Sequence, residues 1–331
     1  MNSFGRLFRI SIFGESHGNS IGVTIDGCPA GLMLKESDFE LDLSRRKSGN
    51  KGTTPRKEDD IPKVLSGILN EHTTGAPITI IFENKNTRHE DYSRMRETPR
   101  PGHADFVSSQ KFGGFEDYRG GGHFSGRLTL ALVTAGVIAK KLLHPINLSA
   151  KLIEAGGNKD IEKAIDKAVE ENDSIGGIIE MIASGIPSGL GEPFFDSFES
   201  MIAHLVFAIP ATKGIEFGTG FQAAKMKGSE HNDNFISQSG KTKTNNSGGI
   251  NGGISNGNNI VFRVAIKPAS SISLVQKTIN MKSGEMTDLK IEGRHDLCIA
   301  LRVPPVLEAA TAIVLTDLML LENKIPRIIK K

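Results

Sequence analysis

The sequence predicts a mixed α+β fold in which helices and antiparallel strands form separate layers. Segments with helical spacing of apolar residues and short β-branched runs both occur along the 331 residues. The two kinds of segment do not alternate regularly, as they would in a doubly wound parallel sheet. No internal repeat stands out. We therefore expect one α+β domain over residues 1–331, built from sheets packed against helices.

Strands are predicted where short apolar runs are rich in β-branched residues. Residues 7–13 alternate between apolar and polar side chains, and residues 21–27 are β-branched and interrupted by glycine, which predicts a hairpin. Later runs predict further strands at 78–82, 178–183 and 260–266.

Helices are predicted where apolar residues recur three or four positions apart. The segments with this pattern are 126–143, 159–172, 200–207 and 306–322. In contrast, residues 225–259 are dominated by Gly, Ser, Asn, Lys and Gln. Such a long segment with few apolar residues predicts a mobile loop, which we interpret as a cofactor-binding loop that a ligand orders.

Composition excludes several classes of protein. The net charge of +2 and the scarcity of aromatic platforms do not predict nucleic-acid binding. Cys28 and Cys298 are far apart and lack a C-x-x-C partner, so neither a disulfide framework nor a metal site is expected. The longest apolar stretch, 128–139, is shorter than the roughly 18 residues of a membrane span. With no targeting motif evident, a soluble, cytoplasmic protein is expected.

The most informative short motif is Gly14-Glu15-Ser16-His17-Gly18. It matches G-x-S-x-G, the nucleophile elbow of serine hydrolases, but an elbow needs a strand followed by a helix. Here a second strand is predicted instead, so the hydrolase interpretation is disfavoured. A glycine turn with a capping serine is the plainer alternative. A functional interpretation places the emphasis on His17, whose imidazole exchanges protons near neutral pH.

Two other features indicate a site for a small polyanion. Basic residues gather in segments expected to be loops, namely 45–57 and the surroundings of Arg94, Arg96, Arg100 and Arg119. The first of these has too many helix breakers to predict a helix. The glycine-rich run 117–127 leads into a predicted helix, whose N-terminus attracts anions. The alternatives are ordinary solvated charge and a glycine connector with a serine N-cap.

Seven sequence blocks together resemble the chorismate synthase family. They are residues 14–18 with 26–29, then 100–105, 117–127, 185–193, 252–255, 267–271 and 293–308. They occur in family order over nearly the whole chain. Leu297 and Pro210 depart from the residues common in the family, Pro and Asn, and His123, Phe124 and Leu128 also differ from some members.

The resemblance implies a lyase at the end of the shikimate pathway. Its members convert 5-enolpyruvylshikimate 3-phosphate to chorismate and phosphate by an anti-1,4-elimination, using reduced FMN without net oxidation. It also implies a layered β-α-β sandwich, a homotetramer, and NADPH or a separate flavin reductase as the source of reducing equivalents. A flavin-binding or regulatory module without elimination is the alternative from another class.

The resemblance also implies residue roles. His17 is expected to protonate the leaving phosphate, His103 to lie beside the flavin, and Asp296 to assist proton transfer to it. Substrate contacts are expected from Ser16, Arg45, Arg127 and Arg302. Flavin contacts are expected from His123, Phe124, Ser125, Pro210, Ala211, Gly252, Lys267, Pro268, Ala269, Ser270, Ser271 and Arg294. Arg46 and Lys51 match positions for the pyridine nucleotide.

Overall fold

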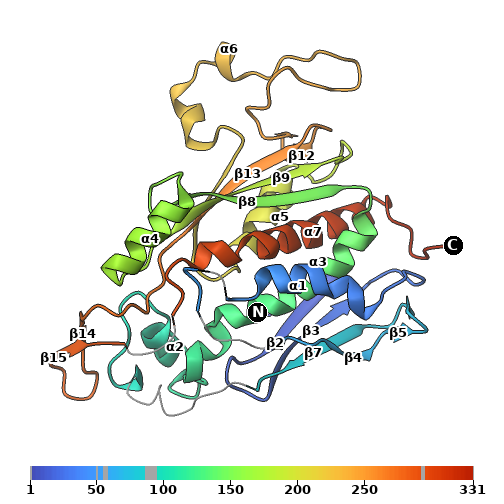
Figure 1. Cartoon of the computed structure of the whole chain (residues 1–331). Helices are drawn as coiled ribbons and strands as arrows, with labels where there is room; N and C mark the ends of the chain where they lie inside the picture. Colours follow the sequence, from blue (N-terminus) through green and yellow to red (C-terminus); the bar gives the residue numbers. More distant parts are fainter. Residues whose placement is uncertain (1, 50, 55–58, 86–94, 292–294, 331) are drawn as a thin grey trace.

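The computed structural model describes residues 2–49, 51–54, 59–85, 95–291 and 295–330. Two antiparallel sheets enclose a layer of helices (Figure 1). The first sheet has the order β1 (Ser3–Phe4), β2 (Arg9–Gly14), β3 (Ser20–Asp26), β7 (Ile78–Glu83) and β4 (Lys63–Ser66). The second has the order β10 (Thr212–Phe217), β13 (Ile260–Ile266), β9 (Gly177–Ser184) and β8 (Asn147–Ala155). The predicted α+β class and the β-α-β layering are confirmed.

The predicted hairpin forms the centre of the first sheet. β2 and β3 pair antiparallel from Arg9 opposite Asp26 to Gly14 opposite Ile21. Alternate residues of β3 and β7 are fully buried on one face, and helix α3 packs against β3. The burial alternates along each strand because one face of the sheet meets the core and the other does not.

Two strands of the second sheet were not predicted. β9 and β13 are the expected strands, and they pair from Ile260 opposite Ala183 to Ile266 opposite Gly177. β8 alternates between polar and apolar residues only as far as Leu152, where its register shifts, and β10 is short and contains Gly214 beside a register shift. Their burial depends on tertiary contacts, which override weak intrinsic preference.

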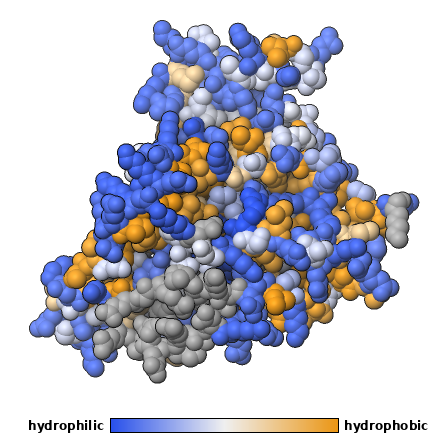
Figure 2. Space-filling view, in the orientation of Figure 1, coloured by the Kyte–Doolittle hydropathy of each residue, from blue (hydrophilic) through white to orange (hydrophobic). Residues whose placement is uncertain are grey.

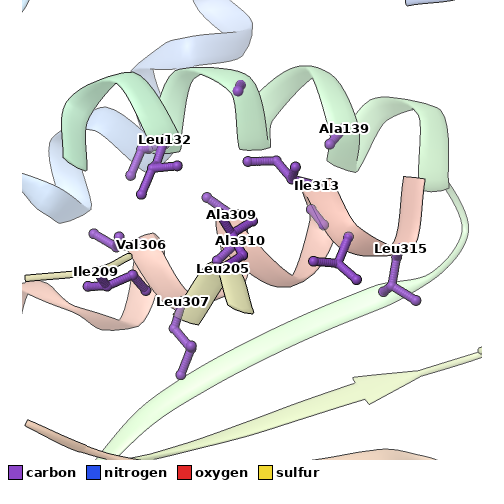
Figure 3. Close-up of a cluster of buried hydrophobic side chains, with 14 of the residues drawn as sticks. Leu132, Ala139, Leu205, Ile209, Val306, Leu307, Ala309, Ala310, Ile313 and Leu315 are labelled. Carbon is purple, nitrogen blue, oxygen red and sulfur yellow. The ribbon is translucent and has the colours of Figure 1, made fainter. Parts of the chain in front are cut away.

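Helices α3 (Thr129–Leu143) and α7 (Pro304–Leu321) form the middle layer (Figure 3). They approach closely because Gly136 faces Ala309. A Cβ atom at position 136 would lie 2.2 Å from the Ala309 Cβ. Among the described helices, α7 has the length and composition of a membrane span, but 83% of that span is buried inside the protein. It is the core helix of the sandwich.

The other elements lie around this core. α5 (Phe198–Val206) packs on α7, and α4 (Ile161–Glu171) begins at the N-cap Asp160. The remaining elements are α1 (Glu40–Arg46), α2 (Asp105–Phe112), β5 (Ile68–Leu69), β6 (His72–Thr73), β14 (Gln276–Ile279) and β15 (Met286–Leu289). The expectation that the basic segment starting at Arg45 is non-helical was wrong at its first two residues. Arg45 and Arg46 form the last turn of α1, where cations favour the negative helix end.

Residues 225–259 adopt defined local structure. The segment contains α6 (Gly228–His231), β11 (Ile250–Asn251) and β12 (Ile254–Ser255). The Asp233 carboxylate accepts hydrogen bonds from the Thr244 hydroxyl and from the backbone amides of Asn246 and Ser247. We call residues 226–247 the arm; it projects from the body beyond the second sheet and is mostly hydrophilic (Figures 1 and 2). These polar contacts stabilise the local structure of the segment. Its low apolar content gave no basis for predicting that structure.

Candidate active site

A cavity of about 1350 Å³ opens beside the middle layer. Its wall includes residues of β2, the end of α1, the glycine-rich run before α3, the end of α5, and the loops around residues 102–104, 267–271 and 295–303. This volume exceeds the roughly 300–1000 Å³ typical of a site for one drug-sized ligand. The cavity can therefore hold two such ligands in contact.

Most of the predicted site residues lie on this wall. They are Arg46, His103, His123, Phe124, Ser125, Arg127, Pro210, Ala211, Lys267, Pro268, Ala269, Ser270, Ser271, Asp296 and Arg302. Five others, Ser16, His17, Arg45, Lys51 and Gly252, do not line it. Arg94 and Arg294 lie outside the described residues.

The guanidinium group of Arg127 is fixed by two hydrogen bonds, which leave its third nitrogen available to a ligand. Its Nε donates to Asn84 Oδ1 at 2.6 Å, and its Nη1 donates to Asp60 Oδ1 at 3.0 Å. Its Nη2 is buried and has no hydrogen-bond partner among the described residues. A buried guanidinium nitrogen without an acceptor costs free energy. Arg127 is therefore prepared to bind an anion in the cavity.

Arg46 and Arg302 extend the positive cluster. Arg46 Nη1 lies 3.7 Å from Asp60 Oδ2, and Arg302 Nη1 donates to Asp296 Oδ2 at 3.2 Å. Burial and the nearby charge of Arg302 lower the pKa of Arg46. With Arg127, three guanidinium groups face the two carboxylates of Asp60 and Asp296, so the wall carries excess positive charge.

Asp296 is fixed from two sides. Besides the bond from Arg302, its Oδ1 accepts a hydrogen bond from the Thr54 backbone amide at 2.8 Å. Arg302 is itself anchored, because its Nε donates to the Arg46 carbonyl at 3.0 Å. The carboxylate is thus held at the cavity wall next to a cation.

His103 and the run 267–271 are joined through segment 100–105. The Gly102 carbonyl accepts hydrogen bonds from Lys267 Nζ at 2.5 Å and from the Ser270 hydroxyl at 2.8 Å. Arg100 Nη1 donates to the Ser271 hydroxyl at 3.0 Å. These bonds connect two segments more than 160 positions apart and place cationic and hydroxyl groups on one side of the cavity.

His17 lies behind the wall, and its expected role in protonating the leaving phosphate stays a prediction. Its side chain is buried against Gly120, and the Ser16 amide donates to the Gly122 carbonyl at 3.1 Å. Gly120 itself lines the cavity. Gly120, Gly121 and Gly122 all have positive φ, between 51° and 79°, which lets the backbone pass between His17 and His103. Because β3 follows the turn, the G-x-S-x-G match is a hairpin and not a nucleophile elbow.

Arg45 and Lys51 are occupied elsewhere. Arg45 donates from Nη1 and Nη2 to the two oxygens of Glu308, both at 2.7 Å, and so joins α1 to α7. Lys51 pairs with Asp166 on α4. Both side chains therefore have a protein partner, and their expected ligand contacts stay predictions. Gly252 lies in the β11–β12 turn, and it does not line the cavity of this chain.

The structure adds residues that sequence reasoning did not assign. Asn84 links the hairpin turn to Arg127, since its Nδ2 donates to the carbonyls of Glu15 and Gly18. His295 lines the cavity, and its buried Nε2 has no partner among the described residues. Burial, aided by the charge of Arg100, lowers the pKa of His295. The sequence could have indicated His295 as a site residue, because it lies next to Asp296 in a block that matches the family.

Comparisons with known proteins agree with the geometry. The family model described as chorismate synthase matches residues 8–320. A chorismate synthase of Chitinophaga pinensis is 64% identical over 331 residues, covering 100% of both chains. One of Methanocaldococcus jannaschii is 43% identical and covers 97% of this chain and 96% of its own. A crystal structure of chorismate synthase superposes with a TM-score of 0.74 at 25% identity, covering 96% of this chain and 93% of that one. The chain therefore belongs to the chorismate synthase family.

Proposed function

We propose that the cavity is where this lyase, a chorismate synthase and the last enzyme of the shikimate pathway, converts 5-enolpyruvylshikimate 3-phosphate to chorismate and phosphate. The reaction is an anti-1,4-elimination that depends on reduced flavin and causes no net redox change. The observation that carries the assignment to this cavity is the buried Nη2 of Arg127, which no described residue bonds, within an excess of positive charge. The substrate brings a phosphate and two carboxylates, which such a cluster stabilises.

Arg127 and Arg302 are the proposed substrate-binding residues. Arg127 offers an unsatisfied donor, and Arg302 lies beside Asp296 at the same wall. Charge builds up on the phosphate as it leaves, so fixed guanidinium groups stabilise the transition state more than the substrate. Arg46 supports them, because Arg46 Nη2 donates to the carbonyls of Gly126 and Arg127 and holds this part of the wall.

A second group of cavity residues fits reduced FMN. Lys267, Ser270 and Ser271 supply a cation and hydroxyl groups for a phosphate, while Pro210, Ala211 and Phe124 offer apolar surface for a ring. When bound, reduced FMN supplies the electron-rich group that the elimination requires. The chain of hydrogen bonds through Gly102 and Arg100 would hold these donors in place.

Proton transfer is proposed to involve His103, Asp296 and His17. His103 and Asp296 are directly accessible from the cavity, whereas His17 supports the wall behind Gly120. Protonation of the leaving phosphate by His17 therefore requires the glycine run to move aside. His103 is the better placed imidazole in the structure as it stands.

The source of reducing equivalents is proposed to be a separate flavin reductase. Direct use of NADPH would draw on Arg46 and Lys51, yet Arg46 is buried and hydrogen-bonded, and Lys51 pairs with Asp166. We further propose one domain, a cytoplasmic location and a homotetramer. A continuous core across both sheets supports one domain, and the exposed Phe115, Phe194, Phe195 and Phe221 support assembly.

An anaerobic phosphate-release assay tests the function. We expect release from the substrate with chemically reduced FMN and none with oxidised FMN or without flavin. NADPH as the sole reductant should give no turnover until a flavin reductase is added. Turnover without flavin would contradict the assignment. His17→Ala and His103→Ala separate an enzyme from a flavin-binding module, because an enzyme loses most of its turnover, down to a measurable remainder, while it still binds FMN.

A further inference from the structure

We propose that Asp105 is a positioning residue for His103, holding a proton on His103 Nδ1 so that Nε2 is the atom that exchanges a proton in the cavity. Asp105 begins helix α2, just after the loop that carries His103. The sequence blocks include both residues, but no role was assigned to Asp105 from them. This role rests on the proposed function of the cavity, in which His103 exchanges a proton.

Asp105 is ionised. Arg100 Nε donates to its Oδ2 at 2.7 Å, Arg100 Nη2 donates to its Oδ1 at 2.8 Å, and the Arg100 backbone amide donates to Oδ2 at 3.1 Å. Burial raises the pKa of Asp105, but the hydrogen bonds from Arg100 and His103 outweigh it and hold this pKa well below its usual range. The two-pronged contact with Arg100 is the strong geometry for a carboxylate and a guanidinium.

The proton on His103 must lie on Nδ1. Nδ1 is 2.6 Å from Asp105 Oδ1, and two acceptors without a proton between them would repel each other at this distance. Arg100 Nη2 also lies 3.0 Å from Nδ1, but a guanidinium has no acceptor atom. The arrangement is therefore consistent when His103 and Arg100 both donate to the same carboxylate oxygen.

His103 Nε2 is left for the ligands. It has no hydrogen-bond partner among the described residues, and the side chain is 23% exposed at the cavity wall. Gly121 packs beside the ring, where even a Cβ atom would be in ordinary van der Waals contact, 3.5 Å from Nε2. When Nε2 takes up a proton, the resulting imidazolium is balanced by Asp105, as in other carboxylate and histidine pairs.

The position of Arg100 makes His103 depend on the Asp105 carboxylate. Without the carboxylate, the guanidinium would face Nδ1 directly and donate to it, which moves the ring proton to Nε2. A positive His103 would then lie next to a positive Arg100. Removal of Asp105 therefore reverses the tautomer and disfavours the imidazolium, whereas a purely structural aspartate would affect neither.

Nuclear magnetic resonance of the protein with ¹⁵N-labelled histidine tests the tautomer directly. With His103→Ala used for assignment, we expect neutral His103 to show a protonated Nδ1 and an unprotonated Nε2, and Asp105→Ala to reverse them. A proton on Nε2 in the unsubstituted protein would overturn the proposal. The spectrum of the unsubstituted protein needs no variant of Asp105. It therefore tests the tautomer even if Asp105 variants fail to fold.

Kinetics with reduced FMN supply the second test. We expect Asp105→Asn to lower kcat about 10- to 100-fold, by analogy with the carboxylates that orient metal-bound histidines. In a His103→Ala background the same substitution should change kcat less than about twofold, because non-additivity marks residues that act as a unit. Asp288→Asn, at an exposed pair with Lys277, is the matched control. Equal losses in both backgrounds would show that Asp105 does not act through His103.

Discussion

The imidazole of His17 occupies the space in which any residue other than glycine at position 120 would place its Cβ. That atom would lie 2.1 Å from His17 Nδ1 and Cε1. Gly120 also has a φ of 58°, which side chains rarely adopt. The His17 ring therefore packs directly against the glycine run. A substitution at position 120 of this run must displace His17.

Gly120→Ala should displace the His17 ring and distort the cavity wall. Because a shift of about 1 Å in an active site can cost on the order of 100-fold in rate, we expect a kcat loss of that size. Phosphate release with reduced FMN measures it. Gly228→Ala is the control, since Gly228 has open space around it and lies in the arm. An unchanged kcat for Gly120→Ala would separate His17 from the reaction.

Arg127→Lys should weaken substrate binding. Lysine keeps the charge but cannot contact Asn84 and Asp60 while offering a third nitrogen to the ligand. Loss of a hydrogen bond to a charged group, about 1.5–3 kcal/mol, predicts a rise in KM of roughly 10- to 100-fold. Arg9→Lys, at an exposed arginine of β2, is the control. An equal KM in both variants would contradict the anion site.

Glu308→Gln should destabilise the fold in a pH-dependent way. Burial raises the pKa of Glu308, but Arg45 and Lys140 lower it by more, so the carboxylate is ionised in the folded state. Its contribution is present above the unfolded pKa of about 4.3 and is lost as the pH falls through the lower folded pKa. Breaking such a buried pair costs about 3 kcal/mol.

Urea denaturation at pH 7 and at pH 3.5 tests this expectation. The difference in free energy of unfolding between Glu308→Gln and the unsubstituted protein should be larger at pH 7. Glu322→Gln, at an exposed glutamate just beyond α7, should show no such difference. A difference that grows at low pH would contradict the assigned ion pair.

Gly136→Ala should force α3 and α7 apart. The added methyl group would lie 2.2 Å from the Ala309 Cβ and 2.5 Å from its Cα. Overpacking of this kind costs about 1–3 kcal/mol. Thermal unfolding should show the loss, and adding Ala309→Gly should recover part of it. If the double variant is no more stable than Gly136→Ala, the contact does not set the helix spacing.

The arm should be protected from proteolysis when FMN and substrate bind, if a ligand orders the segment 225–259. Limited digestion followed by mass spectrometry measures cleavage near the exposed Phe235 and Ile236. A protease cleaves the arm when the arm opens locally. Slower cleavage therefore shows that the ligands favour the ordered arm. An equal rate with and without ligands would make the segment a connector unrelated to the cofactor.

Sequence reasoning succeeded where burial follows local pattern. β3, β9, β13 and α7 have continuous or regularly spaced apolar residues, so their existence and type could be predicted. It failed for β8 and β10, whose pairing partners determine their structure. The cavity residues were predicted mainly through the family resemblance.

Contacts between distant residues explain what the sequence could not show. Arg45 pairs with Glu308, which is 263 positions away. His17 does not line the cavity, because Gly120 covers it through a loop conformation that only glycines adopt readily. Neither relationship has a local signature.

The layered core also constrains the order in which the protein can mature during synthesis. The first sheet is complete once residue 83 has emerged, but α7, which fills the middle layer, ends at residue 321. Translation proceeds at about 5–20 residues per second, so the nascent chain exposes the inner faces of its sheets for many seconds. The unfinished polypeptide therefore presents the kind of apolar surface that chaperones protect.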